Sequence, residues 1–428
     1  MKKLTSNIAF LMSEKVIVLL IGLLSNVVVI RYLGVENFGK LALFQVYYAL
    51  IVSITEFGLR RVYSSLQSIK REKLVFLQTL KIKLLISFIF SLVVVTFIGF
   101  SGDETYYYWL LLAVLASPLE LYVYHFEANL KNDLLVKIRV TVAIALAILR
   151  IALCLLKADL YLIAISFALN NLIINIICCF LVSRRENFLV KIKSNAAKKA
   201  ITKHIFERSF FFWISMVIVQ VNMRTDQLML SSIATVAQVG IYAGAYKLIE
   251  QLMAVPSILS SVFLPYISKN KDINKDEYLT KLYAFILFTT LIISIPGVLC
   301  APYIIPLLLG KGFEASVTVF QILCLSFPFL ALANISGLYY SLNMLEKFAV
   351  FRNACGLGSS LILNYIFIKE LGTNGAAFSV MISYFLISFV YEFALKQTRK
   401  NAVMKLKALK LIFTPHFYSG LRSLVKPR

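Results

Sequence analysis

The sequence predicts an all-α integral membrane protein with about twelve transmembrane helices. Of its 428 residues, 60% are hydrophobic and 15% are charged, and its mean hydropathy is +0.82. Soluble domains have roughly 45–50% apolar and about 25% charged residues. The apolar residues form continuous runs of roughly 20, the length that an α-helix needs to cross ~30 Å of hydrocarbon. Because these runs do not alternate as barrel strands do, helices are predicted.

The predicted spans follow one another along the chain, separated by short polar segments. They are residues 8–30, 40–60, 84–100, 106–126, 138–156, 160–182, 209–232, 240–264, 282–305, 315–341, 348–368 and 375–395. An even number of spans leaves both ends of the chain on the same side of the membrane. The first apolar run is too long for a removable signal peptide and lacks a small-residue cleavage site, so it is predicted to stay as the first span.

The charged residues predict which side that is. The net charge is +23, and most of the 44 Lys and Arg residues lie in loops on the side of the N-terminus. Such a bias marks cytoplasmic loops, so both termini are predicted to be cytoplasmic and no nucleic-acid partner is needed. The densest basic segments run from Arg60 to Lys83, from Arg184 to Arg208 and from Lys396 to Arg428. These segments would also attract anionic membrane lipids.

Enzyme chemistry is not predicted. The sequence has no D-x-D motif, no phosphate-binding loop and no zinc-ligand spacing, and its three histidines are far apart. The six cysteines lie in or at the edges of apolar runs, where they are interpreted as small buried hydrophobes. We therefore expect no metal site and no cofactor. A membrane glycan polymerase or transferase stays as a less favoured alternative, because the outside loops are too short to hold a glycan substrate.

The two halves of the chain contain a short repeat. The segment Val35–Ala42 and the segment Val236–Ala243 share Val, Gly and Ala at a constant offset, and each opens a helix after an outside turn. Copies six spans apart have the same orientation, which predicts two lobes related by a parallel pseudo-twofold axis around a central cavity. In chain order, the sequence predicts an N-terminal six-helix lobe at 1–182, a basic cytoplasmic linker at 183–208, a C-terminal six-helix lobe at 209–395 and a basic cytoplasmic tail at 396–428.

Three segments carry a family resemblance. The turn after the first span reads RYLGVENFG from Arg31 to Gly39, and the second span ends in EFGL from Glu56 to Leu59. Asp226-Gln227 is followed by VGIYAGAYK from Val239 to Lys247. Together these segments closely resemble motifs of the Wzx-type polysaccharide-repeat flippases, which belong to the multidrug/oligosaccharidyl-lipid/polysaccharide exporter superfamily. The resemblance extends over nearly the whole chain.

The resemblance implies a transporter that flips undecaprenyl-pyrophosphate-linked oligosaccharide across the bacterial inner membrane by alternating access. It implies coupling to an ion gradient and a product that feeds O-antigen, capsule or exopolysaccharide assembly, with polysaccharide polymerase and assembly proteins as partners. Arg31, Gly34, Gly39 and Gly240 belong to the motif turns. At these glycines a tight turn requires a positive φ or close packing, so we expect a structural role and no contact with substrate.

Ionisable residues inside the spans are the candidate binding groups, because a charge at the bilayer centre costs ~2.5–3.5 kcal/mol. We expect Arg224 and Lys247 to line the cavity and bind pyrophosphate, to which arginine offers bidentate hydrogen bonds. Asp226 and Glu250 would bias inward against outward states through protonation or sodium binding. Lys247 and Glu250 share a helix face, so an ion pair between them is plausible. The structural alternative is an ion pair between Asp226 and Lys247 across the hairpin.

Two further cations are candidates for binding pyrophosphate in the cavity. Lys15 in the first span and Arg150 in the fifth are also expected to line the cavity, with an interfacial position as the alternative for each. Pro118 should kink the fourth span and free a backbone carbonyl, while His125 near its end is interpreted as interfacial. A proton relay stays as the less favoured interpretation of His125.

Two other transporter classes stay open. A cation-coupled multidrug exporter of the same superfamily would have an acidic cavity, and the embedded charges do not decide against it. A lipid-linked peptidoglycan-precursor flippase usually has fourteen spans, two more than are predicted here. The Arg31–Gly39 turn favours the polysaccharide branch.

Overall fold

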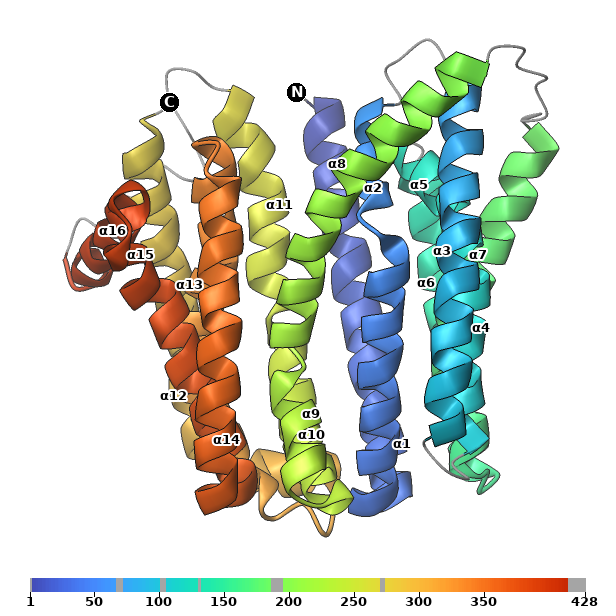
Figure 1. Cartoon of the computed structure of the whole chain (residues 1–428). Helices are drawn as coiled ribbons and strands as arrows, with labels where there is room; N and C mark the ends of the chain where they lie inside the picture. The colour runs from blue at the N-terminus through green and yellow to red at the C-terminus, as the bar shows by residue number, and fades with distance from the viewer. Residues whose placement is uncertain are drawn as a thin grey trace. The chain divides into compact units, whose positions relative to one another are not determined.

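The fold is built from α-helices joined by short turns (Figure 1). The computed structural model describes residues 2–66, 72–100, 105–129, 132–185, 195–269 and 274–414. Within these ranges there is no β-strand.

The described helices before residue 223 include five long ones, α1, α3, α6, α7 and α8, and several short ones. In chain order they are α1 (Lys2–Glu56), α2 (Leu59–Leu66), α3 (Glu72–Phe100), η1 (Thr105–Tyr108), α4 (Trp109–Ala116), η2 (Ser117–Leu119), α5 (Glu120–Ala128), α6 (Asn132–Leu155), α7 (Leu160–Arg185) and α8 (Asn195–Asn222). The remaining elements are α9 (Thr225–Ile233), α10 (Val236–Leu252), α11 (Ala254–Lys269), α12 (Lys275–Leu309), α13 (Ser316–Leu342), α14 (Glu346–Phe385), η3 (Leu386–Val390), α15 (Tyr391–Ala394) and α16 (Lys396–Ile412).

The predicted fold class, an all-α membrane protein, is confirmed. Within the described residues, nine helices are long and apolar enough to cross a membrane. Two of them, Ile17–Leu66 and Glu346–Ala394, each contain two of the predicted spans, which are separated by backbone breaks at Gly34 and Gly372. The predicted span at 240–264 is broken at Met253 into α10 and α11, so neither piece is long enough by itself.

The chain divides into two compact units. Unit 1 consists of Met1–Tyr32 and Leu41–Val221, and unit 2 consists of Leu33–Lys40 and Asn222–Arg428. The predicted linker at 183–208 contains the end of α7 and the first half of α8, while 186–194 lies outside the described residues. The predicted tail begins with a helix, α16, and its residues beyond 414 also lie outside.

In unit 1, the break between α1 and α2 is made by two consecutive residues with positive φ, Phe57 and Gly58. The break leaves the carbonyl of Ile54 without a helical partner, and Trp213 of α8 donates its indole N–H to that carbonyl at 3.0 Å. Phe57 packs against the Trp213 ring at a centroid distance of 5.2 Å. A side chain 159 residues away therefore satisfies the end of α1.

The kink predicted at Pro118 is confirmed. The helix tightens to a 3₁₀ turn, η2, around the proline. The carbonyl of Ser117 accepts a hydrogen bond from Nζ of Lys83 at 2.9 Å, and this lysine also pairs with Glu120. His125 is buried inside unit 1: its ring is 3% exposed and its Nδ1 lies 2.9 Å from the hydroxyl of Tyr63.

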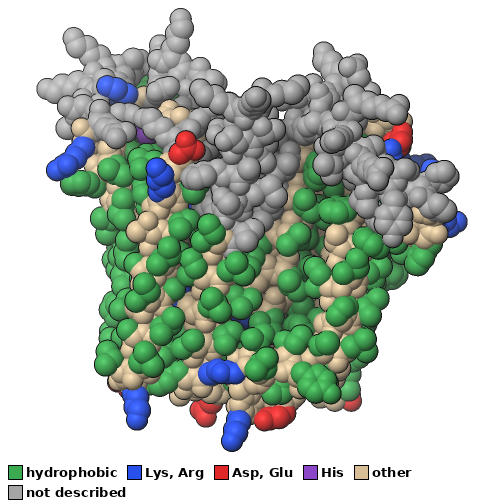
Figure 2. All heavy atoms as spheres, turned by 180° about the vertical axis from the view of Figure 1, so that it is seen from behind, with side chains coloured by type: hydrophobic (Ala, Val, Ile, Leu, Met, Phe, Trp, Pro, Cys, Tyr) green, Lys and Arg blue, Asp and Glu red, His purple; other side chains and the backbone are tan. Residues whose placement is uncertain are grey.

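The core of unit 2 lies between α12, α13 and α16, where the fully buried side chains include Leu282, Tyr283 and Leu332. Outward-facing positions of the long helices are also apolar: Leu299 is 70% exposed and Leu92 of unit 1 is 56% exposed. On the face shown in Figure 2, hydrophobic side chains cover the middle, and most charged side chains lie toward two opposite edges. An apolar exterior of this kind suits contact with lipid.

Candidate functional site

The hairpin of α9 and α10 carries the four residues predicted for pyrophosphate binding and ion coupling in this part of the chain: Arg224, Asp226, Lys247 and Glu250. The α8 helix ends at Asn222, and Arg224, the second residue of the turn that follows, occupies the N-cap position of α9. Thr235 caps α10 by accepting a hydrogen bond from the backbone N–H of Gln238 at 3.3 Å. The interruption before α9 changes the direction of Arg224 relative to a continuous helix, which sequence periodicity alone does not predict.

Arg224, Lys247 and Glu250 form one ion-pair cluster, which we name the Glu250 cluster. Nη2 of Arg224 lies 2.8 Å from Oε1 of Glu250, and Nζ of Lys247 lies 3.0 Å from Oε2. The side chains of Arg224, Lys247 and Glu250 are 18%, 22% and 30% exposed. The pair of Lys247 with Glu250, suggested by their spacing of three residues, is therefore present in the structure.

The charge balance of the Glu250 cluster decides what it can bind. Two cations share one carboxylate, and Arg224 also interacts electrostatically with Asp226. The three side chains of the cluster are partly exposed. Guanidinium and ammonium groups in this setting bind phosphate oxygens strongly. No group of His, Cys, Asp and Glu in the described part of the chain could hold a metal ion.

Asp226 takes a different place in the hairpin. It is 3% exposed and its Oδ2 accepts a hydrogen bond from the hydroxyl of Tyr242 on α10. The Tyr242 ring stacks on that of Tyr246, one helical turn further on, with centroids 5.8 Å apart. Tyr242, the tyrosine of the VGIYAGAYK segment, thus fixes the position of Asp226 from the Asp226-Gln227 segment. The structural alternative from the sequence, in which Asp226 meets Lys247, did not include this tyrosine.

The motif glycines act in the two ways that were expected. Gly34 has φ +68°, in the left-handed region that favours glycine, and so allows the turn after the first span. Gly39 and Gly240 instead pack closely. A methyl group on Gly39 would lie 2.1 Å from the carbonyl oxygen of Val236, and one on Gly240 would lie 2.0 Å from that of Val35. The two repeat motifs therefore pack against each other reciprocally, as a local twofold axis requires.

The remaining predicted charged residues belong to unit 1, whereas the Glu250 cluster belongs to unit 2. Arg150 belongs to unit 1, where it is 9% exposed, bonds Ser166 and lies 3.8 Å from the centre of the Phe167 ring. Arg31 is an exposed residue of α1. Lys15 is also on α1, but its side chain lies outside the described part of the structure.

Unit 1 has a pocket that sequence reasoning missed. It has a volume of about 530 Å³ and is lined by Glu56, Arg60, Arg61, Ser64, Glu127 and Met216. Arg60 makes a two-pronged contact with Glu127, at 2.5 and 2.7 Å. From the sequence, Arg60 and Arg61 were only part of a basic loop cluster. The positive-φ break at Phe57–Gly58 turns them back toward α5 and α8.

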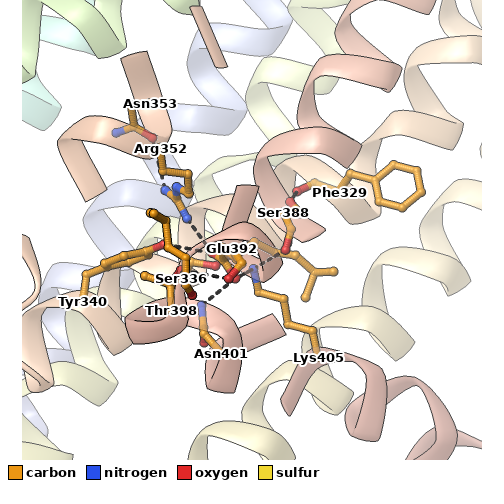
Figure 3. A network of polar contacts seen from close by, with 12 residues as sticks. Phe329, Ser336, Tyr340, Arg352, Asn353, Ser388, Glu392, Thr398, Asn401 and Lys405 are labelled. Carbon is orange, nitrogen blue, oxygen red and sulfur yellow. Dashed lines mark hydrogen bonds and ion pairs between the residues drawn. The ribbon is translucent and has the colours of Figure 1, made fainter. Parts of the chain in front are cut away.

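A second feature missed by sequence reasoning is a buried ionic network in unit 2 (Figure 3). Glu392 is 0% exposed and its carboxylate lies 2.9 Å from Nη1 of Arg352 and 2.7 Å from Nζ of Lys405. Arg352 and Glu392 could have been found as charges near the ends of predicted spans. Lys405 could not, because it is one of several lysines in a basic segment.

Comparisons with known proteins identify the family and the fold. A family model described as polysaccharide biosynthesis protein matches residues 4–271. No curated protein sequence matches the chain. The structure is similar to that of the lipid II flippase MurJ in an inward closed conformation, with a TM-score of 0.75 and 16% identity, covering 98% of this chain and 96% of that one.

Two MATE transporters have similar structures. The MATE transporter VcmN of Vibrio cholerae, in its bent form, has a TM-score of 0.53 and 16% identity, with 99% of both chains covered. The eukaryotic MATE transporter AtDTX14 has a TM-score of 0.55 and 12% identity, with 98% of both chains covered. At these identities the similarity shows a shared fold. Because the family model spans more than half of the chain, the protein belongs to the polysaccharide biosynthesis protein family.

Proposed function

We propose that the protein flips undecaprenyl-pyrophosphate-linked oligosaccharide repeat units from the cytoplasmic to the periplasmic leaflet of the bacterial inner membrane. The observation that carries the proposal is the Glu250 cluster: two partly exposed cations sharing one carboxylate in a membrane-spanning chain. Membership of a polysaccharide biosynthesis family supports a glycan cargo. The shared fold with a lipid II flippase supports a lipid-linked one.

In this proposal the pyrophosphate replaces Glu250 as the partner of the two cations. Arg224 binds two phosphate oxygens with its guanidinium fork, and Lys247 adds a single charged hydrogen bond. The exchange costs less than binding to a solvated cation would, because both side chains are already held in place by Glu250. The glycan itself would be bound less specifically by scattered polar groups.

Glu250 is the proposed coupling residue. Ionised, it neutralises one of its two partner cations and competes with pyrophosphate. Protonated, it releases both cations to the substrate. A change in the protonation of Glu250 would thereby change the affinity for the substrate and bias inward against outward states. Asp226, which is buried and accepts a hydrogen bond from the Tyr242 hydroxyl, is the second proposed coupling residue.

Deletion of the gene in its native host tests the flippase proposal. We expect lipid-linked repeat units to accumulate on the cytoplasmic leaflet, with loss of surface polysaccharide. Digestion of the glycan in intact spheroplasts by an enzyme restricted to the periplasm locates the units. Units that reach the outer leaflet normally in the deletion strain would show that this protein does not flip them.

Replacing either cation of the Glu250 cluster should slow flipping. Arg224→Gln and Lys247→Gln each remove a charge-assisted hydrogen bond worth about 1.5–3 kcal/mol, which corresponds to a loss of roughly tenfold to a hundredfold in substrate affinity. Complementation of the deletion strain by each variant measures this loss, with membrane abundance checked by immunoblotting. Lys311→Gln is the matched control, since Lys311 is an exposed cation of the same unit. Full activity of both cluster variants would remove this site from the proposal.

Glu250→Gln should separate binding from coupling. The neutral amide leaves both cations available at every pH, so we expect tighter substrate binding together with slower turnover and little response to collapse of the proton gradient. Flipping in proteoliposomes, with and without an imposed pH gradient, measures the response. A variant that is stimulated by the gradient as strongly as the wild type would exclude Glu250 as the coupling group.

A cation-coupled multidrug exporter is the second candidate, and the fold shared with VcmN favours it. This function predicts that the deletion strain becomes more sensitive to organic cations while its surface polysaccharide stays intact. The same deletion strain therefore distinguishes the two functions.

A further inference from the structure

The last helix of the described chain, α16, is anchored to unit 2 along one face. Lys405 projects from it into the buried network and donates to Glu392 at 2.7 Å and to the carbonyl of Ser388 at 2.8 Å. Asn401 donates to Glu392 at 2.9 Å, and Thr398 donates to the Glu392 carbonyl at 2.8 Å (Figure 3). Three side chains one helical turn apart are thus held by one region of the bundle.

These anchors determine which face of α16 points outward. Asn401 also accepts a hydrogen bond from Tyr283 of α12 at 2.7 Å. Met404 and Ala408 complete the inner face, and both are nearly fully buried. A helix held at Thr398, Asn401 and Lys405 cannot roll about its axis without breaking buried hydrogen bonds. The buried hydrogen bonds therefore fix which side chains of α16 face outward.

The outer face is basic and has a strip of exposed apolar side chains. The helix contains no Asp or Glu. The exposed basic residues are Lys396, Arg399, Lys407 and Lys410. The exposed apolar residues are Leu406, Leu409 and Phe413, which follows the end of the helix. Phe413 is 80% exposed, and Leu406 and Leu409 are 43% and 42% exposed. Lys400 is paired with Asp276 at 2.5 Å and is left out of this set.

The two kinds of residue occupy adjacent sectors. At 100° per residue, Leu409, Phe413 and Leu406 lie within about 60° of one another, and the four cations occupy the next ~80°. A helix with an apolar strip beside a lysine-rich strip is suited to lie in the plane of a membrane interface. The position of α16 in the chain agrees, because it starts two residues after the apolar segment Glu346–Ala394 ends.

We propose that the outer face of α16 is a docking surface for anionic membrane lipids. The four cations bind lipid phosphates, and Leu406, Leu409 and Phe413 insert between the first acyl carbons. Charge complementarity selects anionic over zwitterionic headgroups, since each Lys or Arg near an anionic surface adds favourable energy. This proposal does not depend on the transported substrate.

The test is the thermal unfolding of the purified full-length protein in detergent micelles, with phosphatidylglycerol or phosphatidylcholine added. We expect phosphatidylglycerol to raise the Tm of the wild type more than phosphatidylcholine does, because a ligand that binds the folded state stabilises it. The variant K396Q/R399Q/K407Q/K410Q should lose at least half of that difference. Its Tm without lipid should change little, because all four side chains are exposed and the bond from Nε of Arg399 to the carbonyl of Phe393, at 3.1 Å, also lies at the surface.

The matched control removes four exposed cations from unit 1 instead, in the variant K81Q/K137Q/K199Q/R208Q. It has the same net charge as the α16 variant and should keep the full phosphatidylglycerol effect. An equal effect in all three proteins would overturn the proposal. So would an equal loss in both variants, which would indicate attraction by net charge and no surface on α16. The variant L406S/F413S should lower the response to both lipids.

Discussion

Gly39→Ala and Gly240→Ala are expected to abolish surface polysaccharide when each replaces the wild-type protein in its host. The added methyl group would lie 2.1 Å or 2.0 Å from a backbone carbonyl oxygen of the opposite turn. No side-chain rotation relieves a clash with backbone, so the two turns must separate. Overpacking typically costs 1–3 kcal/mol and here should reach the upper end of that range or exceed it. Immunoblotting of membranes and the Tm of purified protein distinguish loss of folding from loss of transport.

The control for this prediction is Gly337→Ala in α13, where no atom lies within 4 Å of the added methyl group. It should be neutral or slightly stabilising, because alanine favours a helix over glycine. The double variant G39A/G240A tests whether the contact is reciprocal. Once one methyl has separated the turns, the second should cost much less, so the two effects should not add. Additive effects, or wild-type behaviour of Gly39→Ala, would contradict the close packing.

Glu392→Gln should destabilise unit 2 strongly. The carboxylate is fully buried between Arg352 and Lys405, and an amide of the same shape leaves two buried cations without a counter-charge. Removing one partner of a buried pair typically costs about 3–5 kcal/mol. The Tm of the purified variant in detergent measures the effect, and low abundance in the membrane is the expected result in cells.

The control for Glu392→Gln is Glu346→Gln, which changes an exposed carboxylate at the start of α14 and should alter stability by less than about 0.5 kcal/mol. The double variant E392Q/K405M should recover part of the lost stability, because it removes one of the two uncompensated cations. Equal Tm values for Glu392→Gln and Glu346→Gln would show that the network does not hold α16 in place.

The sequence predicted those properties that depend on local composition. The length of each apolar run decides whether a helix can cross the bilayer, and that length is read without knowing what the helix touches. Gly34 was recognised in the same way, since a turn between two apolar runs favours glycine at positive φ. The pair of Lys247 and Glu250 was predictable because three residues along a helix always share a face.

Pairing between distant residues was decided by the tertiary structure alone. Arg224 meets Glu250 across a hairpin because the chain is interrupted before α9, and a periodicity argument assumes an unbroken helix. Lys405 differs from its neighbours in α16 only in the direction it faces, and Glu392, 13 residues away, makes that direction inward. Composition therefore determined that this chain crosses a membrane as helices. Which of its charges are buried, paired or available to a ligand depends on packing, because electrostatic energy is set by the distance between groups and by their solvent exposure.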